Sequence, residues 1–159
     1  MTKRLLFAFA CILFLSNIAN AQIYSQAVTL AVNSTSIFTV SGNPAAMTVS
    51  TANAGNNVLV SVTENSTTYS VTHNSTTTKR ITAAIDVNLP TDITLQVTLA
   101  SGKGISDGPV ILTTTPTQVV HSITKGADKT NMVTYVFSAL ASAGDMPARV
   151  SNVIFTFTN

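Results

Sequence analysis

The sequence predicts an all-β protein that folds as a single β-sandwich domain. Thr occurs 26 times among 159 residues, and Thr and Val carry β-branched side chains that suit a pleated, half-buried surface. Charged residues make up only 9% of the chain, so helix-favouring Glu, Lys and Arg are scarce. Alternating apolar and polar runs recur at the spacing of about 8–12 residues that is typical of sandwiches and barrels.

The N-terminal stretch is predicted to be a cleaved signal peptide. Two basic residues precede an apolar run over residues 5–15, which is too short to span a bilayer as a resident helix. The small residues Ala19-Asn20-Ala21 match an A-x-A cleavage site. We therefore divide the chain into a signal peptide, 1–21, and a β-sandwich domain, 22–159. The protein is expected to be exported, and to be extracellular, on the cell surface or in the periplasm.

Removal of this signal changes the charge and the cysteine content. Two of the eight basic residues lie in it, so residues 22–159 carry six basic and six acidic side chains. A chain without excess positive charge is a poor nucleic-acid binder, because phosphate neutralisation supplies most of that affinity. Cys11 is the only cysteine, so the exported chain lacks thiol catalysis, zinc–thiolate sites and disulfides. No second long apolar run exists, and no transmembrane helix is predicted.

The first half of the domain contains several predicted strands. Residues 26–32, 37–40 and 47–50 alternate in polarity between turn residues. The first of these runs places three apolar side chains on one face: Val28, Leu30 and Val32. Residues 58–89 predict a three-stranded meander with one face buried, formed by strands at 58–63, 68–73 and 79–89.

The second half continues the same pattern. Strands are predicted at 93–99, 110–113, 118–123, 132–140 and 150–158. The run 132–140 is apolar on both faces, which indicates a central strand or a partner contact. The last strand places three apolar side chains on one face: Val153, Phe155 and Phe157. In total the sequence predicts about nine to eleven short strands.

Titratable residues offer little material for a catalytic or metal site. His73 lies at a strand end and His121 within a strand, and both are expected to be structural or surface histidines. Asp107, Asp128 and Asp145 lie in glycine-containing loops, where calcium binding and ordinary turn chemistry are the two interpretations; turn chemistry accounts for them. No cofactor, metal or catalytic residue is predicted, and the protein is not expected to be an enzyme.

Two further motifs have simple structural interpretations. Ser101-Gly102-Lys103-Gly104 lacks the spacing of a phosphate-binding loop, and no helix follows it. Asn33, Asn65 and Asn74 each begin an N-x-[ST] triplet, and we interpret all three as turn residues.

Four stretches resemble secreted bacterial immunoglobulin-like β-sandwich surface proteins with a pilin-like texture: residues 79–85, 95–99, 133–137 and 153–158. This resemblance implies an immunoglobulin-like, Greek-key arrangement of the strands. The chain departs from chaperone–usher pilins, because it lacks their disulfide cysteines and their usual Gly and penultimate Tyr near the C-terminus.

These observations favour a secreted, non-enzymatic structural or surface protein, such as a filament or fimbria-type subunit or an adhesion component. Self-association, or binding of other cell-surface proteins, is expected through edge strands that contain the two apolar triplets named above. The alternative is a ligand- or carbohydrate-binding module that uses loops 101–108, 124–129 and 142–148. A small outer-membrane β-barrel is disfavoured by the few aromatic residues and the short strands.

Overall fold

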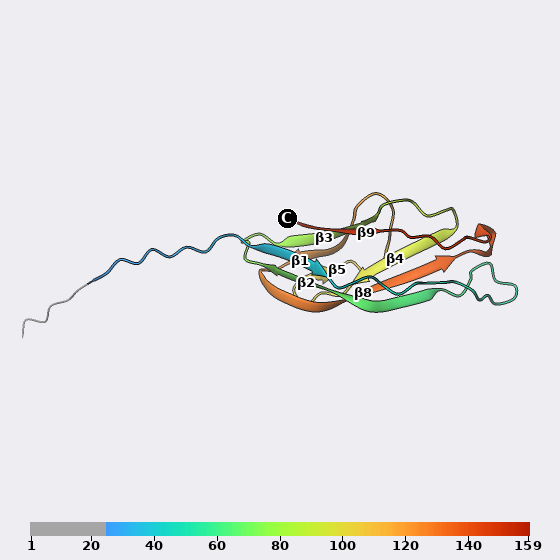
Figure 1. Cartoon of the computed structure of the whole chain (residues 1–159), viewed down its shortest axis with the longest axis horizontal. Helices are drawn as coiled ribbons and strands as arrows, with labels where there is room; N and C mark the ends of the chain where they lie inside the picture. The colour runs from blue at the N-terminus through green and yellow to red at the C-terminus, as the bar shows by residue number, and fades with distance from the viewer. Residues whose placement is uncertain (1–24) are drawn as a thin grey trace, which may run out of the picture. The chain divides into compact units, whose positions relative to one another are not determined.

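The computed structural model describes residues 25–159, which contain two antiparallel β-sheets (Figure 1). The predicted signal peptide and its cleavage site lie outside these residues. Residues 33–159 form one compact unit, whereas residues 25–32 are exposed and without secondary structure. The predicted all-β sandwich is thereby confirmed, while the immunoglobulin-like, Greek-key assignment stays a prediction.

The first sheet has five strands in the order β1-β2-β8-β4-β6. Its strands are β1 (Ser36–Val40), β2 (Val62–His73), β8 (Gly126–Ala139), β4 (Ile93–Leu99) and β6 (Val110–Ile111). The long strand β8 pairs with β2 on one side and with β4 on the other. β8 is therefore a central strand, which is one of the two interpretations given for residues 132–140, although Met132 on its outer face is 46% exposed.

The second sheet has four strands in the order β5-β7-β3-β9. Its strands are β5 (Ile105–Ser106), β7 (Thr117–Ile123), β3 (Lys79–Ile85) and β9 (Val153–Thr158). A single turn of 3-10 helix, η1 (Ala141–Ala143), lies between β8 and β9. The nine strands of the described residues agree in number with the sequence prediction.

The core lies between the two sheets and is built from the inward side chains of alternating strands. Val97, Leu99 and Val133 of the first sheet are fully buried with Ile81 and Val120 of the second. Apolar burial of this kind supplies most of the driving force for folding. Two buried tyrosines belong to the same core: the hydroxyl of Tyr69 donates to the carbonyl of Ala100 at 2.5 Å, and burial raises the pKa of Tyr135 to about 12.

The predicted meander over residues 58–89 is wrong. β2 pairs with β1 and β8, and β3 belongs to the other sheet. β2 combines the strand expected at 68–73 with only residues 62–63 of the strand expected at 58–63, because its register shifts between Glu64 and Thr67 and absorbs the intervening turn residues as a bulge. Local alternation identified the strands here but not their partners, which are distant in sequence.

Other boundaries also differ from the prediction. Residues 26–32 and 47–50 are not strands, and residues 126–129, expected in a loop, begin β8. The predicted loop 101–109 contains the two-residue strand β5. An alternating run becomes a strand only where a neighbouring strand accepts its backbone hydrogen bonds. Residues 126–128 have such a neighbour in β2.

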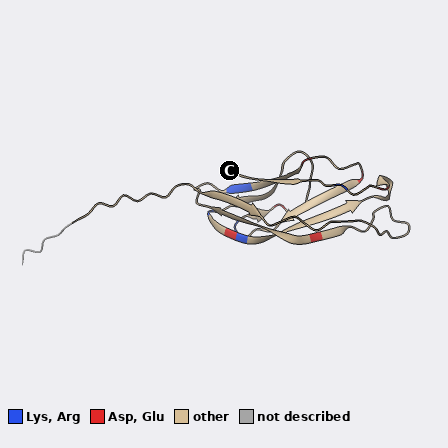
Figure 2. Cartoon of the chain, viewed as in Figure 1, with Lys and Arg blue, Asp and Glu red and all other residues tan. Residues whose placement is uncertain are grey.

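Charged residues are sparse over the described part of the chain (Figure 2). They appear as small separate groups on the ribbon, with long uncharged stretches between them. Among residues 25–159, no helix has the length and apolar character needed to cross a membrane.

Candidate functional site

Two long edge strands are the most conspicuous features on which a function can rest. Each sheet ends in one short and one longer strand: β6 and β5 have two residues each, whereas β1 has five and β9 has six. An edge strand leaves a row of backbone N–H and C=O groups without a neighbouring strand, so it is a template for pairing with another chain. We therefore consider β1 and β9 as candidate assembly edges.

The start of β9 is fixed to the end of β3 by a carboxylate. Asp86 accepts hydrogen bonds from the Asn152 backbone N–H at 2.9 Å, from its side-chain Nδ2 at 2.6 Å, and from the Ser151 hydroxyl at 3.1 Å. These bonds lower the pKa of Asp86, with the Asn152 side-chain bond as the largest cause. They set the register of β9 on β3 from its first residue.

The inward face of β9 is apolar and only partly buried. Val153, Phe155 and Phe157 pack against the core, while Ile154 on the opposite face is exposed. Phe38 of β1 contacts this face from the other sheet, with its ring centroid 5.9 Å from Phe157 and 6.3 Å from Phe155. The two long edges therefore lie on the same side of the sandwich, and aromatic rings fill the seam between them.

The other predicted assembly residues are in a different situation. Val28, Leu30 and Val32 are 71%, 87% and 89% exposed and belong to no strand. The structure thus places the C-terminal triplet in a strand and leaves the N-terminal triplet free. Sequence reasoning missed Phe38 as a seam residue, although its position in the alternating run 37–40 was a signal for it.

The loop residues considered for a phosphate or calcium site serve the fold. Asp128 Oδ2 accepts hydrogen bonds from the backbone N–H groups of Gly102 and Lys103 at 2.9 and 3.0 Å and from the Ser101 hydroxyl at 3.1 Å. The carboxylate thus occupies the amide groups that an anion would need. Within residues 25–159, no three His, Cys, Asp or Glu side chains come together as metal ligands.

The three loops named for a ligand-binding module lie at two different ends of the sandwich. Loop 101–104 is bonded to Asp128 and Thr124, beyond the end of β4. Ser142 donates to Asp92 at 2.8 Å, just before β4 begins. Because β4 separates these contacts along its whole length, loop 142–148 starts at the end of the sandwich opposite to the other two. The three loops therefore do not line a single site.

The two histidines occupy contrasting environments. His73 is 2% exposed, and neither ring nitrogen has a hydrogen-bond partner among the described residues. Its ring lies edge-on to Phe157 at 6.0 Å between centroids. His121 Nδ1 lies 3.0 Å from Asp107 Oδ1 in a half-exposed pair.

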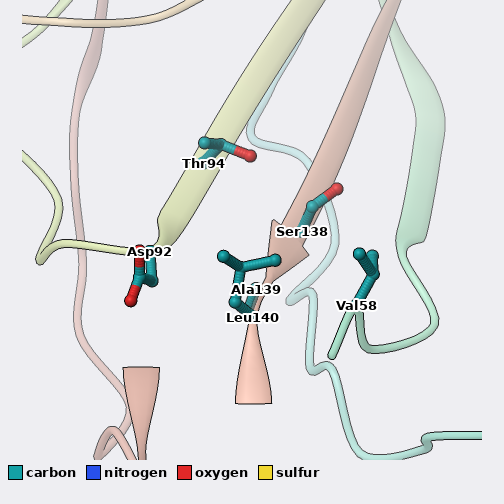
Figure 3. A pocket seen from close by; sticks show the side chains of 6 residues that line it. All are labelled: Val58, Asp92, Thr94, Ser138, Ala139 and Leu140. Carbon is teal, nitrogen blue, oxygen red and sulfur yellow. The ribbon is translucent and has the colours of Figure 1, made fainter. Parts of the chain in front are cut away.

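A shallow depression of about 340 Å³ lies between β4 and β8 (Figure 3). Its lining combines one carboxylate with two hydroxyls and three apolar side chains: Asp92, Thr94, Ser138, Val58, Ala139 and Leu140. Ser138 is hydrogen-bonded to Ser61 at 2.8 Å, and Asp92 accepts from Ser142. Asp92 is the one ionisable side chain in this lining, and its carboxylate already holds the Ser142 hydroxyl.

Comparisons of the chain with protein-family models, with curated proteins and with solved structures find no match. The edge strands β1 and β9 and the exposed segment 26–32 are therefore the features from which a function is proposed.

Proposed function

We propose that this protein is an exported structural subunit that assembles with copies of itself by β-strand addition. The proposal is carried by one observation: an exposed segment with alternating apolar residues directly precedes a sandwich that has two long edge strands. In strand addition, main-chain hydrogen bonds supply affinity and alternate side chains supply specificity. A filament or fimbria-type role on the cell surface follows from such assembly.

The exposure of the segment supports this proposal on energetic grounds. Contiguous exposed apolar surface on a single copy marks an interaction site. Val28, Leu30 and Val32 lie on one face of an extended chain, and full burial of such side chains is worth about 1.5–3 kcal/mol each. Near-zero net charge in residues 22–159 removes the long-range repulsion that would oppose self-association.

The test compares two aspartate substitutions in residues 22–159. Leu30→Asp places a charge on the apolar face, whereas Thr29→Asp adds the same charge on the other face. The loss of a buried Leu alone corresponds to about 10- to 100-fold weaker association. Light scattering and electron microscopy should find assemblies for the unchanged chain and for Thr29→Asp, and monomers for Leu30→Asp. An unchanged chain that stays monomeric at high concentration would refute the proposal.

Ligand binding remains the second candidate function, with one supporting observation. Loop 101–104 lies beside residues 124–129, which include the start of β8, and the two are joined by the Asp128 bonds and by the Thr124 N–H, which donates to the carbonyl of Lys103 at 3.0 Å. These loops carry no aromatic residue for a sugar to stack on. A glycan array on which the chain binds a defined sugar, with binding lost in Lys103→Ala, would favour this candidate over assembly.

A further inference from the structure

We propose that residues 26–32 of one copy add to the free edge of β9 in a second copy, antiparallel to it and with Leu30 opposite Phe155. This inference rests on the self-assembly proposed above. It adds the acceptor edge and the register, which are argued below, and an antiparallel direction, which all strand pairs of the described residues share.

The backbone of β9 offers hydrogen-bonding groups along its free side. Asp86 donates its N–H to the carbonyl of Asn152 at 3.0 Å, which places the peptide groups of Asn152 on the β3 side. Peptide groups alternate between the two sides of a strand, and the β3–β9 pairing is regular along all of β9. The N–H and C=O groups of Val153, Phe155 and Phe157 therefore point to the free edge. These three residues can exchange hydrogen bonds with an incoming strand.

The side chains of the two segments match in number and spacing. Val153, Phe155 and Phe157 are alternate residues on the inward face and only partly buried. The N-terminal segment has an apolar triplet with the same spacing at residues 28, 30 and 32. With Leu30 opposite Phe155 in an antiparallel pair, each apolar residue of one triplet faces one of the other. Such cross-strand pairs are the units that stabilise a sheet.

The remaining edges are weaker acceptors. β5 and β6 have two residues each and cannot pair with a seven-residue segment along its length. In β1, the Ser41 N–H donates to the Thr68 carbonyl, so the peptide groups of Ser41 point toward β2. Because peptide groups alternate between the two sides of a strand, those of Ser36, Phe38 and Val40 point to the free edge. Of these three side chains, Phe38 alone packs against the core, while Val40 is exposed. β1 thus offers one inward apolar partner where β9 offers three.

The hydrogen bonds of Asn74 favour a second copy over the chain's own segment. Asn74 Nδ2 donates to the carbonyl of Asn33 at 2.8 Å, and its Oδ1 accepts from the N–H of Thr35 at 2.7 Å. The N–H of Asn74 donates to the carbonyl of Thr35 at 3.2 Å. Residues 33–35 therefore continue the line of β1 along β2. A tight reversal within residues 33–35 would break these bonds.

Disulfide cross-linking between two separately prepared chains tests the edge and the register together. Residues 22–159 contain no cysteine, so each introduced thiol is unique. In the proposed register Thr29 lies opposite Thr156, and both are exposed. Thr29 and Thr156 would form a non-hydrogen-bonded pair, in which the Cα atoms of directly opposite residues are about 4.5 Å apart. This distance lies within the range of disulfides. A Thr29→Cys chain labelled with nitrogen-15 is mixed with an unlabelled Thr156→Cys chain, oxidised, and analysed by mass spectrometry.

Thr39→Cys in β1 is the matched control, because Thr39 would face Thr29 if the segment added to β1 instead. The Thr156→Cys mixture is expected to yield at least about tenfold more mixed disulfide dimer than the Thr39→Cys mixture. Equal or greater yield with Thr39→Cys, while light scattering shows normal assembly, would overturn the edge assignment and leave the proposed function standing. A Thr29→Cys, Thr156→Cys double variant that forms its disulfide within one chain would overturn the assignment of the acceptor β9 to a second copy. A cysteine-free chain that stays monomeric would overturn both proposals.

Discussion

Replacement of His73 by phenylalanine is expected to raise the free energy of unfolding by about 1–3 kcal/mol. The imidazole is 2% exposed, and neither of its nitrogens has a hydrogen-bond partner among the described residues. A buried polar group without a partner costs about 1–3 kcal/mol, and an imidazole carries two such groups. Phenylalanine removes both nitrogens, but it is slightly larger, so we expect a gain at the level of one group rather than two.

The structure also indicates that a phenyl ring fits at this position. The imidazole already lies edge-on to Phe157, with the ring planes at 65°, and aromatic pairs favour this geometry. The ring at position 73 therefore keeps its aromatic neighbour after the substitution. Two positive side chains lie near this part of the sandwich. Lys79 Nζ is 5.6 Å from the Phe157 ring centroid. Lys103 lies against Gly126, and Gly126 is the partner of His73 in the pairing of β2 with β8.

The assay is urea unfolding at pH 8, followed by far-ultraviolet circular dichroism. At this pH histidine side chains in model peptides are uncharged. The measurement is made in the Leu30→Asp background, because assembly would otherwise add to the apparent stability. His121→Phe is the control: its imidazole is 35% exposed and its Nδ1 lies 3.0 Å from Asp107 Oδ1, so a smaller gain than that of His73→Phe is expected. A loss of stability in His73→Phe would refute the reasoning and would mean that the buried nitrogens are hydrogen-bonded in solution.

Two further predictions concern the loop at 101–104 and the start of β9. Gly104→Ala should lower the free energy of unfolding by about 1–3 kcal/mol, because a Cβ there would lie 2.7 Å from Ile123 Cγ1 and 2.8 Å from the His121 carbonyl oxygen. Unchanged urea unfolding of this variant would show that the loop moves aside without cost. The hydrogen bonds from Asn152 lower the pKa of Asp86 from its ordinary value. The ionised carboxylate therefore stabilises the fold at pH values above the unfolded-state pKa of about 3.9. This contribution to stability is lost as the pH falls below the unfolded-state pKa. Unfolding of the parent chain and of Asp86→Asn should therefore differ at pH 6 and converge toward pH 2.5, and a difference that stays constant with pH would contradict this assignment.

The candidate assembly residues show how far alternation alone can lead. The pattern at residues 153–158 predicted a strand with Val153, Phe155 and Phe157 on one face, and the structure has that strand. The same pattern at residues 26–32 predicted another strand, yet those residues have none. Alternation reports which side chains would share a face, but a strand also needs a neighbour for its backbone groups. Only the three-dimensional arrangement shows that one triplet has such a neighbour, in β3.

The sequence by itself determined the class of the fold and most of the strands, and it limited the run at 132–140 to a central strand or a partner contact. These features are local, because β-branched composition and period-two alternation express the same physical preference along each short segment. The tertiary structure decided which strands pair, that β2 and β3 belong to different sheets, that His73 is buried, and that β9 has a free edge beside Phe38. These features depend on contacts between residues far apart in the chain, and their pairing is selected by the packing of the whole core.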